Sequence, residues 1–259
     1  MTLSADNIAV ELGGHRILKQ IGLTVRRGEM LALVGPNGSG KSTLLKTLSG
    51  EYRPVTGQVQ LNGTELSTLD PKTVARHRSV VSQSAPVVFD FSVAEILEMG
   101  WLDDQYGDGN HYHSAMRQVV VENRIEHLLN RTFNTLSGGE QQRVQFARAL
   151  LQVWQPPEQT ETRFLLLDEP TANLDIAHEI NLLSLSRQYV RRCAGALVVL
   201  HDLNMASRFC DTIALLSHGE IVAHGPVAEV LDEQLLSDVY STPIQVEWHD
   251  KLHRHVIHS

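Results

Sequence analysis

A glycine-rich segment near the N-terminus constrains the fold of this chain most. Gly35 is followed by four residues and then by Gly40, Lys41 and Ser42, and the segment lies between an apolar run and a helical pattern. Glycines let successive backbone N–H groups approach a phosphate chain, while a lysine and a hydroxyl can neutralise phosphate oxygens and hold Mg²⁺. A loop that only turns the chain does not require Lys41 and Ser42 at this spacing. The predicted nucleoside triphosphate contacts are Gly35, Pro36, Asn37, Gly38, Ser39, Gly40, Lys41, Ser42 and Thr43.

Short apolar runs alternate with helical patterns along the chain, which is typical of an α/β fold with a central parallel sheet. The clearest predicted strands of that sheet are residues 31–34, 164–167, 196–200 and 212–216. Further predicted strands at residues 8–12, 23–25 and 58–61 indicate an antiparallel β region beside the parallel core.

Strand signals disappear between roughly residues 93 and 150, where helical patterns surround a predicted loop at 106–113. This change predicts an α-helical subdomain inserted within a single domain that covers residues 1–259. Farther along, residues 218–226 read as a hairpin and residues 227–240 as a short helical end.

Two acidic residues follow the apolar run at 164–167. Asp168 and Glu169 are expected at the carboxyl end of a buried strand, the edge where open α/β sheets bind ligands. Asp168 is suited to the Mg²⁺ shell, and Glu169 could polarise a water that attacks the γ-phosphate. A strand that merely ends in two solvated carboxylates is the alternative, but the glycine-rich loop favours a Mg²⁺-dependent nucleoside triphosphatase. The chain lacks the Asn-Lys-x-Asp guanine reader of GTPases.

A second glycine pair opens the helical pattern that begins after Leu136. Ser137 and Glu140 have the spacing of a helix capping box, which by itself indicates only a helix start. Gly138 and Gly139 weaken the first turn, but they allow an anion to approach the positive end of the helix. The segment therefore predicts a second phosphate-binding surface.

With these motifs the sequence resembles the ATP-binding subunits of ABC transporters from about residue 8 to residue 240. The resemblance implies a P-loop core and a head-to-tail homodimer, in which Ser137, Gly138 and Gly139 contact the ATP of the partner. The same likeness assigns Gln83 to Mg²⁺ beside Ser42 and Asp168, and makes Gln83 and His201 catalytic together with Glu169. The segment Asn173, Leu174 and Asp175 would cross to the partner's site.

One position departs from the family pattern. The family usually stacks adenine on an aromatic residue shortly before the phosphate loop, and the aligned residue here is Leu12, with His15 or Ile17 nearby. We expect looser base selectivity as a result.

The composition restricts the possible partners. A formal net charge of -8 does not suit broad nucleic-acid binding, and no uncharged stretch is long enough to cross a bilayer. The resemblance then implies two separate transmembrane permease subunits and membrane association through them, on the cytoplasmic face of the bacterial inner membrane. Docking of the permease and packing in the core are equal alternatives for the apolar residues Val87, Val88, Phe89 and Phe91.

The cargo is indicated by a long segment at residues 151–164 that contains Trp-Gln-Pro-Pro. It resembles the corresponding segment of haem-import ATP-binding proteins, which implies haem uptake together with a periplasmic haem-binding protein. The alternative is that the sequence of such an insert varies freely because it lies in a surface loop. Cobalamin or ferric siderophore import remains open, as does a soluble or export ABC-type ATPase. Direct metal binding by the tail histidines is not expected, because we expect a polar tail to stay solvated. These histidines are His249, His253, His255 and His258.

Overall fold

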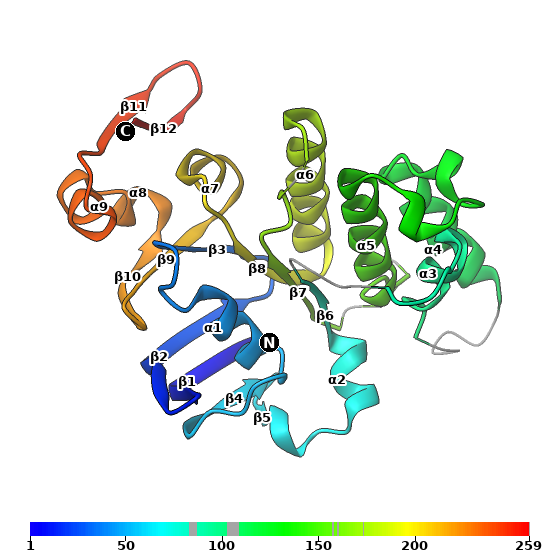
Figure 1. Ribbon diagram of the computed structural model, residues 1–259, viewed down its shortest axis with the longest axis horizontal. Helices are drawn as coiled ribbons and strands as arrows, with labels where there is room; N and C mark the ends of the chain where they lie inside the picture. Colours follow the sequence, from blue (N-terminus) through cyan, green and yellow to red (C-terminus); the bar gives the residue numbers. More distant parts are fainter. Residues whose placement is uncertain (83–86, 103–108, 157, 160, 173, 259) are drawn as a thin grey trace.

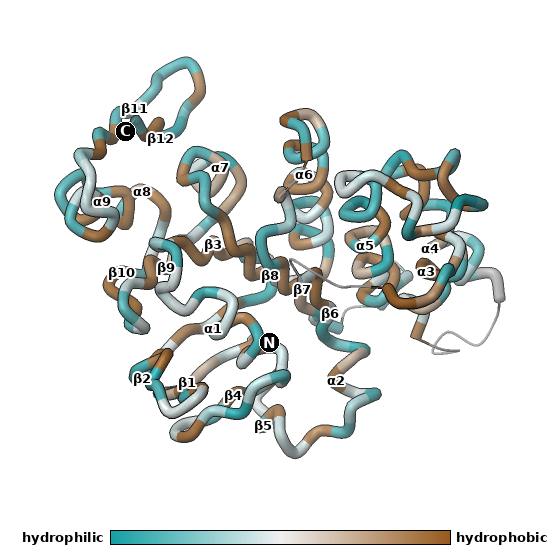
Figure 2. The backbone as a smooth tube through the Cα atoms, in the orientation of Figure 1, coloured by the Kyte–Doolittle hydropathy of each residue, from teal (hydrophilic) through white to brown (hydrophobic). Residues whose placement is uncertain are grey.

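The computed structural model describes residues 1–82, 87–102, 109–156, 158–159, 161–172 and 174–258 (Figure 1). Its centre is a six-stranded sheet with the order β10-β9-β3-β8-β7-β6, parallel except for β10 at one edge. The strands are β3 (Met30–Val34), β6 (Arg78–Val81), β7 (Arg163–Asp168), β8 (Ala194–Val199), β9 (Thr212–Ser217) and β10 (Glu220–Pro226). Figure 2 shows hydrophobic residues concentrated along β3, β7 and β8, as expected for strands that are covered on both faces.

A second, antiparallel sheet has the order β2-β1-β4-β5. Its strands are β1 (Thr2–Leu12), β2 (His15–Arg26), β4 (Thr56–Leu61) and β5 (Thr64–Glu65). Helix α1 (Lys41–Leu48) packs between this sheet and the central one and buries Leu44, Leu45 and Leu48 against both. The helix that follows the phosphate loop is therefore fixed by apolar contacts on two sides.

Helices cover the other face of the central sheet (Figure 1). The longer ones are α4 (Gly109–Glu122), α5 (Gly138–Gln152) and α6 (Ile176–Arg192), and α3 (Val93–Glu98) packs on α5. Residues such as Val119 and Phe146 share one apolar core with Leu165 and Leu167 of β7. The remaining short helices are α2 (Pro71–His77), α7 (Leu203–Phe209), α8 (Val227–Val230), α9 (Glu233–Tyr240), and the 3-10 turns at Leu66–Thr68, Glu126–Leu128 and Phe133–Thr135.

The predicted fold class, a P-loop core with a flanking antiparallel region and helices between β6 and β7, is confirmed. Several details of the prediction were wrong. Strand β6 was missed because it is short and runs into polar residues, and β1 and β2 are longer than predicted because bulges interrupt their alternation. The expected loop at 106–113 is wrong from Gly109 onward, where α4 begins.

The C-terminal tail is folded, and three of its four histidines, His249, His253 and His258, are exposed as expected. Strands β11 (Gln245–His249) and β12 (Arg254–His258) form a hairpin that packs on α7. The Asn204 side chain donates to the Ile257 carbonyl at 3.0 Å and accepts from the Ile257 amide at 2.9 Å. Ser207 donates to the His255 carbonyl at 2.8 Å. Among the described residues, no group of three or more His, Cys, Asp or Glu side chains could hold a metal ion.

No helix within the described ranges combines the length and the apolar character needed to cross a membrane.

Asp211 ties three elements of the core together. Its carboxylate accepts a hydrogen bond from the Met30 amide at 2.8 Å and forms a bidentate ion pair with Arg187 of α6. Burial alone would raise the pKa of Asp211, but the hydrogen bonds from Arg187 and Met30 outweigh it and leave that pKa below its ordinary value.

We expect Asp211→Asn to lower the free energy of unfolding at neutral pH by about 1–2 kcal/mol, because a charged hydrogen-bond acceptor is lost. Since the folded pKa is lowered, the stabilisation is complete above the unfolded pKa of about 3.9 and is lost as the pH falls through the folded value. Urea unfolding of both proteins from neutral to acidic pH measures this. If the difference in the free energy of unfolding between the two proteins does not shrink in acid, the stabilising role of the ionised Asp211 carboxylate is contradicted.

Candidate functional site

The phosphate loop joins β3 to α1, and two of its glycines are favoured by a positive φ and by close neighbours, which are backbone atoms at Gly35 and a side chain at Gly40. Gly35 has φ 147°, and a Cβ there would lie 2.0 Å from the Leu216 carbonyl oxygen. Gly40 has φ 108°, and its Cβ would lie 2.8 Å from a methyl group of Leu18. The loop is thus held against β9 and β2 in a shape that side chains would not permit.

Lys41 occupies the centre of this loop. Its Nζ donates to the carbonyl oxygens of Gly35 at 2.8 Å and Pro36 at 2.9 Å, and the residue is only 5% exposed. Burial lowers the pKa of Lys41, although the negative charges of Glu169 and Asp168 act in the opposite direction. An ammonium enclosed by carbonyl oxygens in this way can exchange those contacts for phosphate oxygens.

The carboxyl end of β7 brings the predicted carboxylates to the same edge. Ser42 Oγ donates to Asp168 Oδ1 at 3.2 Å, and Asp168 is 3% exposed. Burial raises the pKa of Asp168 above its ordinary value, with the Ser42 hydrogen bond opposing the shift. This pair of oxygens, one on a buried and one on a partly buried residue, fits the preference of Mg²⁺ for hard oxygen ligands.

His201 reaches Glu169 from the neighbouring strand. His201 Nε2 lies 2.6 Å from Glu169 Oε1, and the Glu169 side chain is mostly covered whereas that of His201 is half exposed. The two residues follow β7 and β8, which pair directly in the sheet. Lys41, Asp168, Glu169 and His201 therefore gather at one edge, and Gln83 lies outside the described residues.

The backbone of Glu169 is strained. Its φ is 50°, in the left-handed region, and it precedes Pro170, which normally restricts the preceding residue to extended conformations. Such a conformation costs on the order of 1–3 kcal/mol and persists only where the surroundings hold it. No sequence signal indicated this strain.

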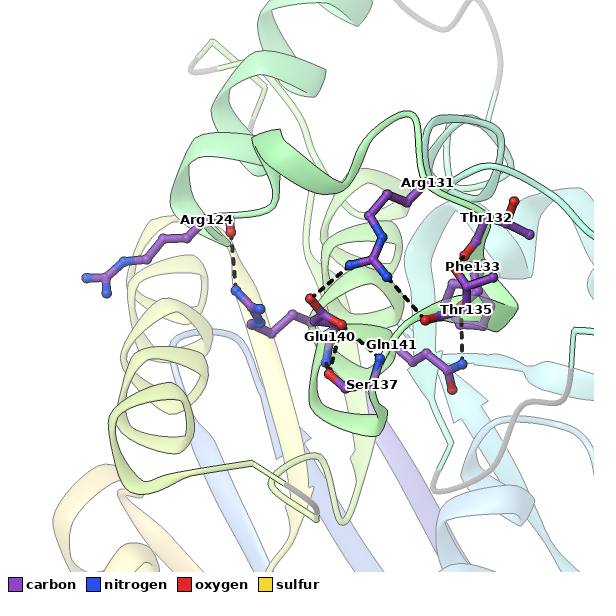
Figure 3. A network of polar contacts seen from close by, with 9 residues as sticks. Arg124, Arg131, Thr132, Phe133, Thr135, Ser137, Glu140 and Gln141 are labelled. Carbon is purple, nitrogen blue, oxygen red and sulfur yellow. Dashed lines mark hydrogen bonds and ion pairs between the residues drawn. The ribbon is translucent and has the colours of Figure 1, made fainter.

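A network of polar contacts holds the start of α5 (Figure 3). Ser137 and Glu140 form the predicted capping box, and the Arg131 side chain contacts both the Glu140 carboxylate at 3.5 Å and the Thr135 carbonyl at 3.2 Å. Hydrogen bonds from Ser137 lower the pKa of Glu140. The Gly138–Gly139 turn is thus presented on a fixed support.

This turn borders a hollow that it shares with the start of α6. Asp175 caps α6 by accepting from the His178 amide at 2.9 Å, and Asn173 lies outside the described residues. The described residues that line the hollow come from α5, α6 and the segment before α6: Ser137, Gly138, Gly139, Glu140, Arg143, Leu174, Asp175 and His178. The phosphate loop of the same chain contributes no described residue to this lining, so the two predicted phosphate-binding surfaces stay separate within one chain.

Leu12 lies at the tip of the β1–β2 hairpin, paired with His15, and is 36% exposed. His15 is exposed and Ile17 half-buried. The Ile17 carbonyl approaches the position of a Gly40 Cβ to 3.5 Å, so this hairpin adjoins the phosphate loop. A base bound here would meet an aliphatic surface.

The apolar segment at residues 87–91 is divided between the core and the surface. Val87 and Phe91 pack against the main core. Val88 and Phe89 are 83% and 70% exposed, so this pair is available for a partner.

The Trp-Gln-Pro-Pro segment is anchored, at Trp154, which is 7% exposed. Its Nε1 donates to Gln118 Oε1 at 3.0 Å, its carbonyl accepts from Arg163 at 2.7 Å, and its ring lies 6.0 Å from that of Trp101. The alternative of a freely drifting surface loop does not fit this tryptophan.

Comparison with known proteins gives a consistent result. Residues 18–172 match the family described as ABC transporter. The chain is 42% identical to the Hemin import ATP-binding protein HmuV of Rhodopseudomonas palustris over 94% of this chain and 90% of that protein, and 41% identical to its counterpart in Bordetella parapertussis over 97% of both.

Solved structures agree in fold. An ATP-binding subunit of an ABC transporter superposes with a TM-score of 0.80 at 27% identity, covering 93% of this chain and 98% of that one. A dimeric ATP-binding cassette bound to ADP and Pi superposes with a TM-score of 0.73 at 26% identity, covering 88% of this chain and 99% of that one.

The aliphatic base surface predicts weak discrimination between bases. GTP should compete measurably with ATP for the wild-type chain, and Leu12→Tyr should tighten ATP binding about three- to tenfold, because an aromatic contact is worth about 0.5–1.5 kcal/mol. Equilibrium titration with a fluorescent ATP analogue, with GTP as competitor, measures both effects. Indifference of the bound analogue to GTP would refute the prediction.

Proposed function

Because the chain belongs to the ABC transporter family, we propose that it is the ATP-hydrolysing subunit of a bacterial importer that takes up haem. The observation that carries the proposal is the meeting of Lys41, Asp168, Glu169 and His201 at one edge of the central sheet. The remaining steps follow from what each of these groups can do chemically.

The triphosphate binds along the loop from Gly35 to Thr43. Backbone N–H groups and the positive end of α1 bind the phosphate oxygens, and Lys41 exchanges its carbonyl partners for the β- and γ-phosphates. Ser42 and Asp168, with Gln83, would hold Mg²⁺, which would neutralise charge on the phosphates.

Glu169 acts as the base that orients and polarises the attacking water. His201 contacts its carboxylate, so the two side chains together define where a water can sit opposite the γ-phosphate. The held, strained backbone of Glu169 keeps this carboxylate in place before the nucleotide arrives.

Two copies of the chain complete two sites. The Ser137–Gly139 turn is separate from the phosphate loop of its own chain, so it is free to cover the γ-phosphate of a partner, with Asp175 beside it. The similar cassette that binds ADP and Pi is itself a dimer. ATP would stabilise the closed homodimer more than ADP does, and hydrolysis would then reopen it.

The homodimer works beneath two transmembrane permease subunits, on the cytoplasmic face of the inner membrane, with a periplasmic haem-binding protein delivering the cargo. Support for haem comes from the names of the relatives, which are 41–42% identical over nearly the whole chain. Exposed Val88 and Phe89 offer an apolar contact for the permease. Cobalamin and ferric siderophores are the alternative cargoes.

Replacing the base separates binding from hydrolysis. We expect Glu169→Gln to lower the rate of ATP hydrolysis at least about 100-fold, the usual contribution of a positioned general base, while ATP binding persists and the dimer becomes trapped. Steady-state hydrolysis and size-exclusion chromatography with ATP measure this, and Glu179→Gln on α6 is a control that removes the same charge farther along the chain. Hydrolysis by Glu169→Gln at the wild-type rate would exclude Glu169 as the base.

The cargo is tested by transport. We expect liposomes that contain the chain and its permease to take up haem from the binding protein when ATP is present, and the Glu169→Gln complex to take up none. Parallel assays with cobalamin and a ferric siderophore identify the cargo. Uptake of another chelate but not of haem would contradict the haem assignment and leave the proposed ATPase role in place. ATP-driven efflux would identify an exporter.

A further inference from the structure

Helix α5 contacts two parts of the molecule through consecutive glutamines. Gln141 donates to the Phe133 carbonyl at 3.2 Å, within the helical region shown in Figure 3. Gln142 instead donates from Nε2 to the carbonyl oxygen of Pro170 at 3.1 Å. Its side chain is partly buried, and the contact joins the helix that begins at Ser137 to the loop directly after Glu169.

The Pro170 carbonyl is a sensitive place for such a contact. Pro170 follows Glu169, which among the described residues of the site is the non-glycine residue with a left-handed backbone, and the proline ring favours extended conformations for the residue before it. In the described part of this loop, the Ala172 amide donates to the Glu169 carbonyl at 3.1 Å, and His201 contacts the Glu169 carboxylate. Gln142 therefore holds the carbonyl of the residue that follows the base.

We infer that Gln142 is a positioning residue for hydrolysis: it holds the loop after Glu169 and ties the geometry of the base to the position of α5. This inference rests on the proposed function. Under that proposal, the start of α5 lies on the ATP of the partner subunit. Any movement of α5 on ATP binding would then be transmitted by Gln142 to the base of its own subunit, so that each site reports its occupancy to the other.

The role makes a specific kinetic demand. A residue that positions the base changes the rate of the chemical step and leaves nucleotide affinity unchanged. Loss of a residue that only stabilises the fold does not lower the rate selectively while sparing the affinity. The effect must also act through Glu169, so it disappears when Glu169 no longer serves as the base.

The test uses Gln142→Met in the full-length chain, which keeps the length of the side chain and removes the donor. We expect kcat for ATP hydrolysis to fall about five- to tenfold, the loss of one partly buried hydrogen bond, with an unchanged KM for ATP and an unchanged melting temperature. Gln142→Glu, whose ionised side chain only accepts hydrogen bonds, should lower kcat at least as much. Gln145→Met is the matched control on α5, because among the described residues the side-chain hydrogen bond of Gln145 stays within that helix, where it accepts from Arg148 at 2.9 Å.

Single-turnover hydrolysis in the Glu169→Gln background completes a double-mutant cycle. In that background we expect Gln142→Met to cause no further fall in the rate of hydrolysis. An equal fall in kcat for Gln145→Met, a rise in KM without a fall in kcat, or the same fold-loss in the Glu169→Gln background would overturn the positioning role while leaving the proposed function in place. Wild-type hydrolysis by Glu169→Gln alone would instead overturn the base assignment on which the inference rests.

Discussion

The parallel pairing of β3, β8 and β7 is the constraint on which the rest of the site depends. Leu33 pairs with Val199, and Asp168 pairs with Val199 from the other side, so the three strands end at one level. The phosphate loop, His201 and the Asp168–Glu169 pair each follow one of these strands directly. The pairing of the three strands therefore brings together three short segments that are far apart in the sequence, since the ladder hydrogen bonds set their separation.

Apolar packing on both faces keeps this edge rigid. Helix α1 lies between the two sheets, and α5 shares a core with β7 through residues such as Phe146 and Leu165. The site itself carries the unfavourable features: a buried lysine, a buried aspartate and a left-handed glutamate before a proline. Strain and buried charge are tolerated there because the surrounding core overdetermines the backbone.

The sequence was sufficient for those parts of the site whose geometry is local. The phosphate loop, the Ser137 capping box and the strand before Asp168 are each determined by residues a few positions apart, and each lies where the motif predicts it. The contacts that were missed join distant residues: Gln142 with Pro170, Trp154 with Gln118, and Asn204 with Ile257. A glutamine or asparagine on a helix gives no sign of its partner, because any carbonyl within reach satisfies it equally well.

The C-terminal hairpin has a consequence for how the protein is made. Residues 245–258 emerge from the ribosome only after α7, on which they pack, has been synthesised, and α7 begins two residues after His201. Until then Asn204 lacks the backbone groups of Ile257 that its amide binds, and Ser207 lacks the carbonyl of His255. A nascent chain can thus complete its phosphate loop before α7, the helix that begins two residues after His201, has gained its contacts with the hairpin.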